Sequence, residues 1–196
     1  CQVDALHIAT AAHFGADLLL SWNFKHIVNV GRIMGFNGIN MQLKKLDSSF
    51  YGHHTHLVED WDNHQGQWQT GKVRGYGVVI ISIKNLTFTI PLRSNISHKA
   101  AYIIVKSQEQ GVRGKELDYS KALLITNMQY IANVPFKISA SEHNTLQNKE
   151  VFITSQFDKY VARYIKVVKK QDNHILNSIE YRFTILKNYH VELELV

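Results

Sequence analysis

The chain has 196 residues and a net charge of +6, with 45% hydrophobic and 19% charged residues. This composition is typical of a folded globular protein and excludes a disordered chain, and no apolar run approaches the roughly 18 residues that a membrane-spanning helix needs. The single cysteine, Cys1, excludes an internal disulfide framework and favours a reducing compartment. With no signal-peptide pattern at the start of the chain, we expect a cytoplasmic protein with no membrane association.

The excess positive charge lies outside the first 43 residues. Residues 1–43 contain two basic and two acidic side chains, so the whole excess belongs to residues 44–196. Together with an isoelectric point near 9.3, this distribution favours a polyanionic partner such as a nucleic acid. A basic surface that only meets solvent is the alternative.

The first 43 residues contain one predicted helix and one predicted strand. Residues 3–14 place apolar side chains at helical spacing, and Gly15 ends that helix. Residues 17–22 form an apolar run typical of a buried strand. A helix and a strand cannot close a core alone, and the chain opens within a helical pattern instead of with Met. We therefore expect residues 1–43 to be a truncated unit that packs poorly on the rest.

The composition changes near residue 44, where we place a domain boundary. Residues 44–70 are rich in His, Asp, Gln and Trp and predict a linker followed by a polar, partly ordered segment. Residues 76–83 and 86–92 are apolar runs separated by Lys84-Asn85, a pattern that predicts a β-hairpin.

Two more β-branched runs, residues 100–105 and 121–126, predict strands on either side of a glycine- and charge-rich loop. Residues 142–170 and 175–193 then repeat apolar side chains every three or four positions, which predicts helices. In the first helical stretch the apolar positions include Val151, Phe152 and Phe157. Strands followed by helices predict an α+β fold, with an antiparallel barrel over residues 72–126 and the helices packed on it.

Residues 1–43 carry two motifs, Asp4-Ala5-Leu6-His7-Ile8-Ala9 on the predicted helix and Leu19–His26 after the predicted strand. Together they resemble the C-terminal third of a PIN domain, the metal-dependent nuclease fold of VapC-like toxins. The resemblance implies that Asp4 once helped to hold a divalent cation, with Asn23 where many members carry another acid. Hard cations need several oxygen ligands, so Asp4 is interpreted as a vestigial ligand, or as a helix cap, and no metal is expected.

A second group of motifs joins Arg74-Gly75-Tyr76-Gly77, the hairpin, and Pro91–Lys99. Pro91 cannot donate a ladder hydrogen bond, so it predicts a strand end or edge. The polar side chains after it suit a phosphate, because arginine binds phosphate oxygens with a planar fork and histidine transfers protons near neutral pH. Metal-free RNA cleavage needs a base, an acid and a cation for the charged transition state. Arg93, Ser94, His98 and Lys99 can supply that set.

A third motif, residues 114–125, places Asp-Tyr-Ser-Lys directly before a buried run. Read with the hairpin motifs, it resembles the TenpN branch of the type III toxin–antitoxin families, relatives of the ToxN and AbiQ toxins, over residues 44–196. The resemblance implies an SH3-like β-barrel similar to MazF and Kid, with C-terminal helices. It also implies a metal-independent endoribonuclease, active in phage defence without a cofactor, that leaves a 2′,3′-cyclic phosphate. The implied partners are cellular RNA and a structured repeat RNA antitoxin, with which it forms a higher-order complex.

In ToxN-like members a hydroxyl residue and a nearby lysine after Pro-Leu are thought to be catalytic, and Ser94 matches the hydroxyl. The lysine spacing differs, because Ile96 lies two residues after Ser94. The proton-transfer role is therefore open among His98, Lys99 and Lys121. The full hypothesis makes three residues catalytic and four RNA-binding, and all of them except Lys99 line a common groove. The catalytic residues are Arg93, Ser94 and His98; the RNA-binding residues are Arg74, Tyr76, Lys99 and Lys121.

Other residues have simpler interpretations. The histidines at 53, 54 and 56 lack a neighbouring Cys or carboxylate cluster, so a polar segment is favoured over a metal site. Trp61 and Trp68 either stack on bases or pack against the domain. Two other functions stay open: a non-catalytic RNA-binding module, and a PIN-type, Mg-dependent ribonuclease with an appended domain.

Overall fold

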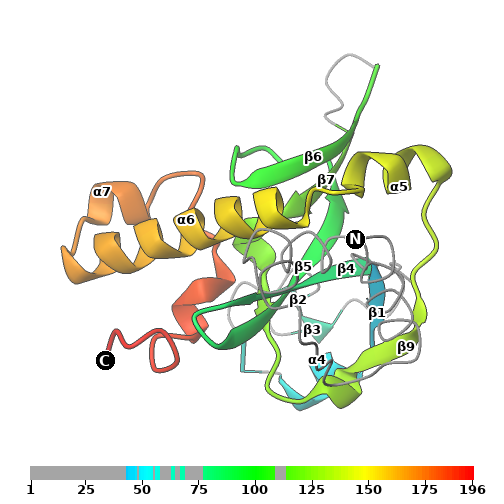
Figure 1. Ribbon diagram of the computed structural model, residues 1–196. Helices are drawn as coiled ribbons and strands as arrows, with labels where there is room; N and C mark the ends of the chain where they lie inside the picture. Colours follow the sequence, from blue (N-terminus) through cyan, green and yellow to red (C-terminus); the bar gives the residue numbers. More distant parts are fainter. Residues whose placement is uncertain are drawn as a thin grey trace, which may run out of the picture.

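The computed structural model describes residues 43–47, 49–54, 56–57, 63–64, 67–68, 77–108 and 114–196. This part of the chain is an antiparallel sheet with helices packed against it, which confirms the predicted α+β class (Figure 1). The predicted helix and strand of the first 42 residues, and the PIN resemblance with Asp4, lie outside the described residues. Arg74 and Tyr76 also lie outside them.

The main sheet has seven strands, and all its pairings in the described ranges are antiparallel. The order is β6-β7-β5-β4-β1-β9, and β8 pairs with β5. A separate ribbon joins β2 (Asn63–His64) to β3 (Gln67–Trp68). The strands of the main sheet are β1 (Lys44–Leu46), β4 (Gly77–Ile83), β5 (Leu86–Ser94), β6 (Ala101–Lys106), β7 (Gly114–Asp118), β8 (Leu123–Leu124) and β9 (Ile131–Pro135).

The predicted hairpin is confirmed as β4 and β5. Its two turn residues, Lys84 and Asn85, have φ values of 49° and 62°, as a two-residue hairpin turn requires. The predicted strand end at Pro91 is wrong, because β5 continues to Ser94. Pro91 is instead the last residue of β5 that pairs with β4, and from Leu92 onward the strand pairs with β7.

The prediction of a linker from residue 44 is also wrong. β1 lies inside the sheet, between β4 and β9, and a short helix, α4 (Ser49–His53), follows it. Leu43, Leu46 and Phe50 are buried in the core, so this polar segment belongs to the folded domain.

The segment from residue 101 to 135 contains two strands that the sequence did not predict, β7 and β9. β7 arises in the predicted loop and begins at Gly114, which has a φ of 108° and lies so close to the Val105 carbonyl oxygen that a side chain would not fit. The predicted strand over residues 121–126 is reduced to β8. The 3₁₀ helix η1 (Tyr119–Lys121) precedes β8, and η2 (Met128–Tyr130) follows it.

The predicted helices over residues 142–170 are confirmed as α5 (Ala140–Leu146) and α6 (Glu150–Lys169). Figure 1 shows α6 crossing the sheet, with the C-terminal segment folded back beside it. Phe157 of α6 packs its ring edge-on against Phe88 of β5, with ring centroids 5.3 Å apart. Val151 and Phe152, two of the apolar positions that predicted this helix, are exposed, because α6 buries the face of Ile153, Phe157, Tyr160, Val161, Tyr164 and Val167. No helix in the described ranges is long and apolar enough to cross a membrane.

Residues 175–193 do not form the predicted helix. The chain here forms the end of α7 (Asn173–Leu176), a series of turns, and the 3₁₀ helix η3 (Ile185–Asn188). Tyr189 still buries its side chain, whereas Ile179 and Phe183 are about half exposed. The apolar spacing therefore identifies some of the side chains that approach the core, such as Tyr189, but the backbone that carries them forms turns instead of a helix.

Candidate active site

The candidate site forms where β5 and β7 end side by side. Arg93 of β5 pairs with Glu116 of β7, so both side chains lie on one face of the sheet. Asp118, two residues after Glu116, lies on the same face. Arg93 Nη1 donates a hydrogen bond of 2.7 Å to Asp118 Oδ2. The Asp118 side chain is fully buried and that of Arg93 is 24% exposed, so the buried carboxylate holds a guanidinium that reaches solvent.

Asp118 is the centre of the hydrogen-bond network. It caps the 3₁₀ helix η1, and its Oδ1 accepts from the backbone N–H of Ser120 at 3.0 Å and from Ser120 Oγ at 2.7 Å. His98 Nε2 lies 3.1 Å from Ser120 Oγ and 3.4 Å from Asp118 Oδ1. One buried carboxylate therefore positions three side chains that come from β5, the following loop and η1.

The loop after β5 brings His98 to this network. Asn95 turns the chain with a φ of 58°, and its backbone N–H donates to the Gly114 carbonyl oxygen at 3.1 Å. Ile96 and Ala100 are buried on either side of His98. These contacts fix the loop, so the position of His98 is set by the fold.

Lys121 enters from the end of η1. Its side chain is only 8% exposed, and its Nζ donates to the backbone carbonyl oxygen of Phe183 at 2.8 Å. The contact ties the C-terminal turns to the cations of the site.

These side chains line an open pocket of about 240 Å³. Burial lowers the pKa of the His98 imidazole; the charge of Asp118 raises it, and that of Arg93 lowers it. The net direction is downward, so His98 is neutral at neutral pH. The pocket thus combines Arg93 and Lys121 as cations with a neutral imidazole. Its lining residues include Arg93, Ser97, His98, Ser120, Lys121, Ile179, Glu180 and Phe183.

Ser94 and Lys99 do not join this pocket. Successive residues of a strand point to opposite faces, and Ser94 lines a second pocket, of about 490 Å³, with Lys115 and Phe136. There Lys115 forms an ion pair of 2.5 Å with Glu142. Burial alone raises the pKa of Glu142, but hydrogen bonds from Lys115 and Ser139 outweigh it and lower that pKa. The predicted common groove therefore does not include Ser94.

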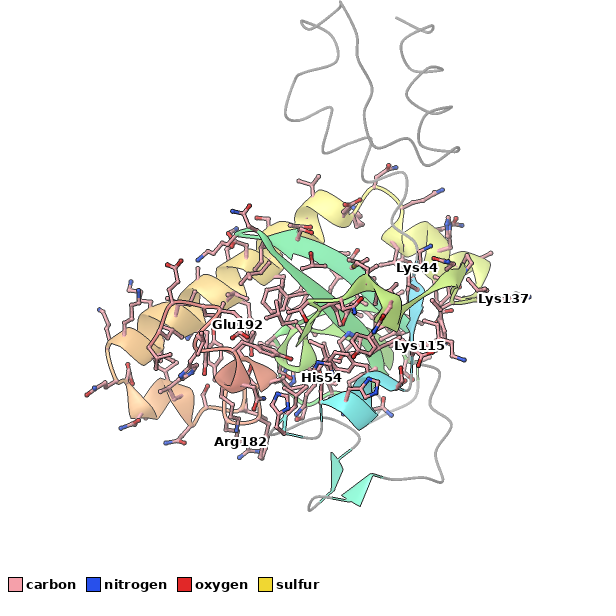
Figure 2. All side chains as sticks on the ribbon, turned by 90° about the horizontal axis from the view of Figure 1, so that it is seen from below. Lys44, His54, Lys115, Lys137, Arg182 and Glu192 are labelled. Carbon is pink, nitrogen blue, oxygen red and sulfur yellow. The ribbon has the colours of Figure 1, made fainter. Side chains whose placement is uncertain are left out.

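The two pockets lie at separate places on the molecule. Lys115 and Lys137 line the second pocket, and Figure 2 shows both apart from Arg182, the neighbour of Phe183 in the first pocket. Lys99 is exposed in the loop after β5, outside either lining.

His53 and His54 contact the aromatic residues Tyr130 and Phe50. His53 Nδ1 lies 3.0 Å from the Tyr130 hydroxyl, and the His54 ring stacks on Phe50 with centroids 4.1 Å apart. Within the ranges that the structure describes, no group of three or more His, Cys, Asp or Glu side chains is arranged to hold a metal ion.

Asp118 and Ser120 were not predicted as site residues. The available signal was the Asp-Tyr-Ser-Lys motif, in which polar residues directly precede a buried run. Ile179 and Phe183 were missed because their apolar spacing predicted a packed helix, and Glu180 lies in the same stretch. Comparison with known proteins adds no relative, because no family model, curated protein or solved structure matches the chain.

Proposed function

We propose that this protein is an endoribonuclease that cleaves RNA without a metal ion. The observation that supports this proposal is the meeting of Arg93, His98 and Lys121, from three separate segments, around one open pocket above the buried Asp118. Two cations and an imidazole are the groups that metal-free RNA cleavage needs.

In the proposed reaction the ribose 2′-oxygen attacks the neighbouring phosphorus and the bond from phosphorus to the 5′-oxygen breaks. The 2′-hydroxyl proton passes to the neutral His98 imidazole, and the leaving 5′-oxygen receives a proton from the Lys121 ammonium group. Arg93 binds the non-bridging phosphate oxygens, whose negative charge grows in the transition state. The products are a 2′,3′-cyclic phosphate and a 5′-hydroxyl group.

We also propose the wider role that the TenpN resemblance implies. The chain would act in the cytoplasm as a type III toxin for phage defence, held by a structured repeat RNA in a higher-order complex, with its sheet as part of an SH3-like barrel. The support is the order of motifs over residues 74–121, which contains the candidate site. Induced expression in bacteria should arrest growth, and co-expression of the antitoxin RNA should restore it.

Binding of RNA without cleavage is the second candidate. The position of His98 favours it, because its Nε2 faces Ser120 and the buried Asp118 and its Nδ1 is shielded from solvent. A phosphate could then rest on Arg93 and Lys121 with no proton transfer. A cleavage assay separates the two functions, since a binding module retains intact RNA.

The central test is cleavage of single-stranded RNA in the presence of EDTA. Because Arg93 and Lys121 supply the positive charge, we expect the rate to survive chelation and the products to carry a 2′,3′-cyclic phosphate. The Arg93→Ala variant, purified in parallel, controls for contaminating nucleases. Activity that disappears with EDTA and returns with Mg²⁺ would instead support the PIN-type ribonuclease.

The pH dependence tests the role of His98. A neutral imidazole accepts a proton, and burial lowers the pKa of His98 below its ordinary 6.5. We therefore expect the cleavage rate to rise with pH through a midpoint below 6.5 and then to level off, with an acid-side loss as His98 becomes protonated. His98→Ala should lower the plateau by about 10²–10⁴-fold. A profile whose acid limb is unchanged in His98→Ala would assign proton transfer to another group.

A further inference from the structure

The candidate active site has a second, apolar wall opposite its cations. Ile179 and Phe183 line the same pocket as Arg93 and His98, and their side chains are 46% and 48% exposed. Single exposed apolar residues are common on protein surfaces. Here two of them lie in the lining of one charged pocket.

Buried tyrosines fix the backbone of this wall. The Tyr160 hydroxyl of α6 donates to the Glu180 carbonyl oxygen at 3.0 Å and lies 3.1 Å from Thr184 Oγ1. The Tyr181 hydroxyl donates in return to the Tyr160 carbonyl oxygen at 3.1 Å, and the two rings stack with centroids 4.9 Å apart. Hydrogen bonds from Tyr160 to Glu180 and Thr184 thus attach the turn that carries Phe183 to α6.

The wall is also attached to the cationic side of the pocket. Lys121 Nζ donates to the Phe183 carbonyl oxygen at 2.8 Å, so the backbone that carries the ring is bonded to the ammonium group. The Arg182 guanidinium carbon lies over the Phe183 ring, 4.6 Å from its centroid. An aromatic ring backed by arginine, beside two cations, combines a stacking surface with a phosphate site.

We propose that the wall formed by Ile179, Glu180 and Phe183 binds an unpaired nucleobase next to the phosphate held by Arg93. This inference rests on the proposed function, and it specifies single-stranded RNA as the substrate class. A base within a duplex keeps its faces stacked on its neighbours, whereas an unpaired base can stack on an aromatic side chain.

Glu180 sets which base edge is accepted. Its side chain lies at the pocket, 28% exposed, with Arg163 Nη1 3.4 Å from its Oε2. A carboxylate only accepts hydrogen bonds, so it attracts the amino groups of adenine, cytosine or guanine. It disfavours uracil, whose edge carries two carbonyl oxygens on either side of a single N–H.

The test measures binding of a single-stranded RNA that contains 2-aminopurine and a 2′-O-methyl group on every ribose, so that it is not cleaved. Phe183→Ala keeps the carbonyl that binds Lys121 and should raise Kd by about 5- to 100-fold. It should also remove the stacking-induced quenching of 2-aminopurine. Phe183→Trp should bind like the wild type. Phe152→Ala, which removes a similarly exposed ring outside the pocket, is the matched control.

The outcomes separate this inference from the proposed function. Unchanged Kd and quenching in Phe183→Ala would overturn the base-binding wall and leave cleavage by Arg93 and His98 untouched. Wild-type binding with quenching, but no cleavage of unmodified RNA, would overturn the nuclease alone. Glu180→Gln should narrow the preference for an adenine-rich over a uracil-only strand, and an unchanged preference would contradict the role of Glu180.

Discussion

Replacing Arg93 with alanine is expected to slow RNA cleavage by about 10²–10³-fold, the cost of losing one donor that stabilises transition-state charge. Arg93 donates to the buried Asp118 and also reaches solvent, with 24% of its side chain exposed. Arg93→Lys should recover only part of the rate, because an ammonium group cannot bind two phosphate oxygens with a planar fork. Initial rates on a fixed single-stranded RNA measure both effects.

The control for Arg93 removes a positive charge elsewhere. Lys159 lies exposed on α6, outside the pocket. If Arg93→Ala is slow because of its place in the pocket and not because one positive charge is lost, Lys159→Ala should cleave RNA at the wild-type rate. Thermal melting must accompany the assay, since Arg93→Ala leaves the Asp118 carboxylate without its guanidinium. A stably folded Arg93→Ala variant with full activity would place the active site elsewhere.

The hairpin and the long helix were predictable because local sequence determines them. Lys84-Asn85 stands between two β-branched runs, and asparagine tolerates the positive φ that the turn needs. The helix itself follows from the apolar spacing, although α6 buries Ile153 and leaves Val151 and Phe152 exposed. In both cases neighbouring residues supply the hydrogen bonds and the pattern.

β7 was not predictable because distant strands create it. Its sequence, Gly-Lys-Glu-Leu-Asp, has the composition of a loop, yet Glu116 and Asp118 are buried. Burial of a carboxylate needs a partner from elsewhere in the fold, and for Asp118 that partner is Arg93, 25 residues away. No local pattern contains this information.

The candidate site was predictable in its chemistry and only partly in its geometry. Arg93, His98 and Lys121 were selected as side chains suited to phosphate and proton transfer, and the structure brings them to one pocket. Ser94 was grouped with Arg93 because the strand was expected to end at Pro91. Because β5 continues to Ser94, Arg93 and Ser94 are successive strand residues, and their side chains point to opposite faces of the sheet.

Removing the Asp118 carboxylate is expected to have the largest effect on stability. Asp118→Ala leaves Ser120 and Arg93 without their acceptor and should lower the free energy of unfolding by about 3 kcal/mol. We take the lower end of the range for buried ion pairs because Arg93 is partly exposed. Asp118→Asn keeps the shape and one acceptor oxygen, so it should be less destabilised in denaturant unfolding. Cleavage should fall in both variants.

A second measurement shows whether the charge of Asp118 acts on His98, in addition to the hydrogen bonds that Asp118 accepts. The negative charge of Asp118 raises the pKa of His98, and the positive charge of Arg93 lowers it. In an NMR titration of His98, Asp118→Asn should therefore shift the midpoint to lower pH, and Arg93→Ala should shift it to higher pH. If Asp118 and Arg93 had only a structural role, the two variants would not shift the His98 midpoint in opposite directions. Shifts in the same direction would show that His98 does not respond to these two charges, and the proposed network would have to be abandoned.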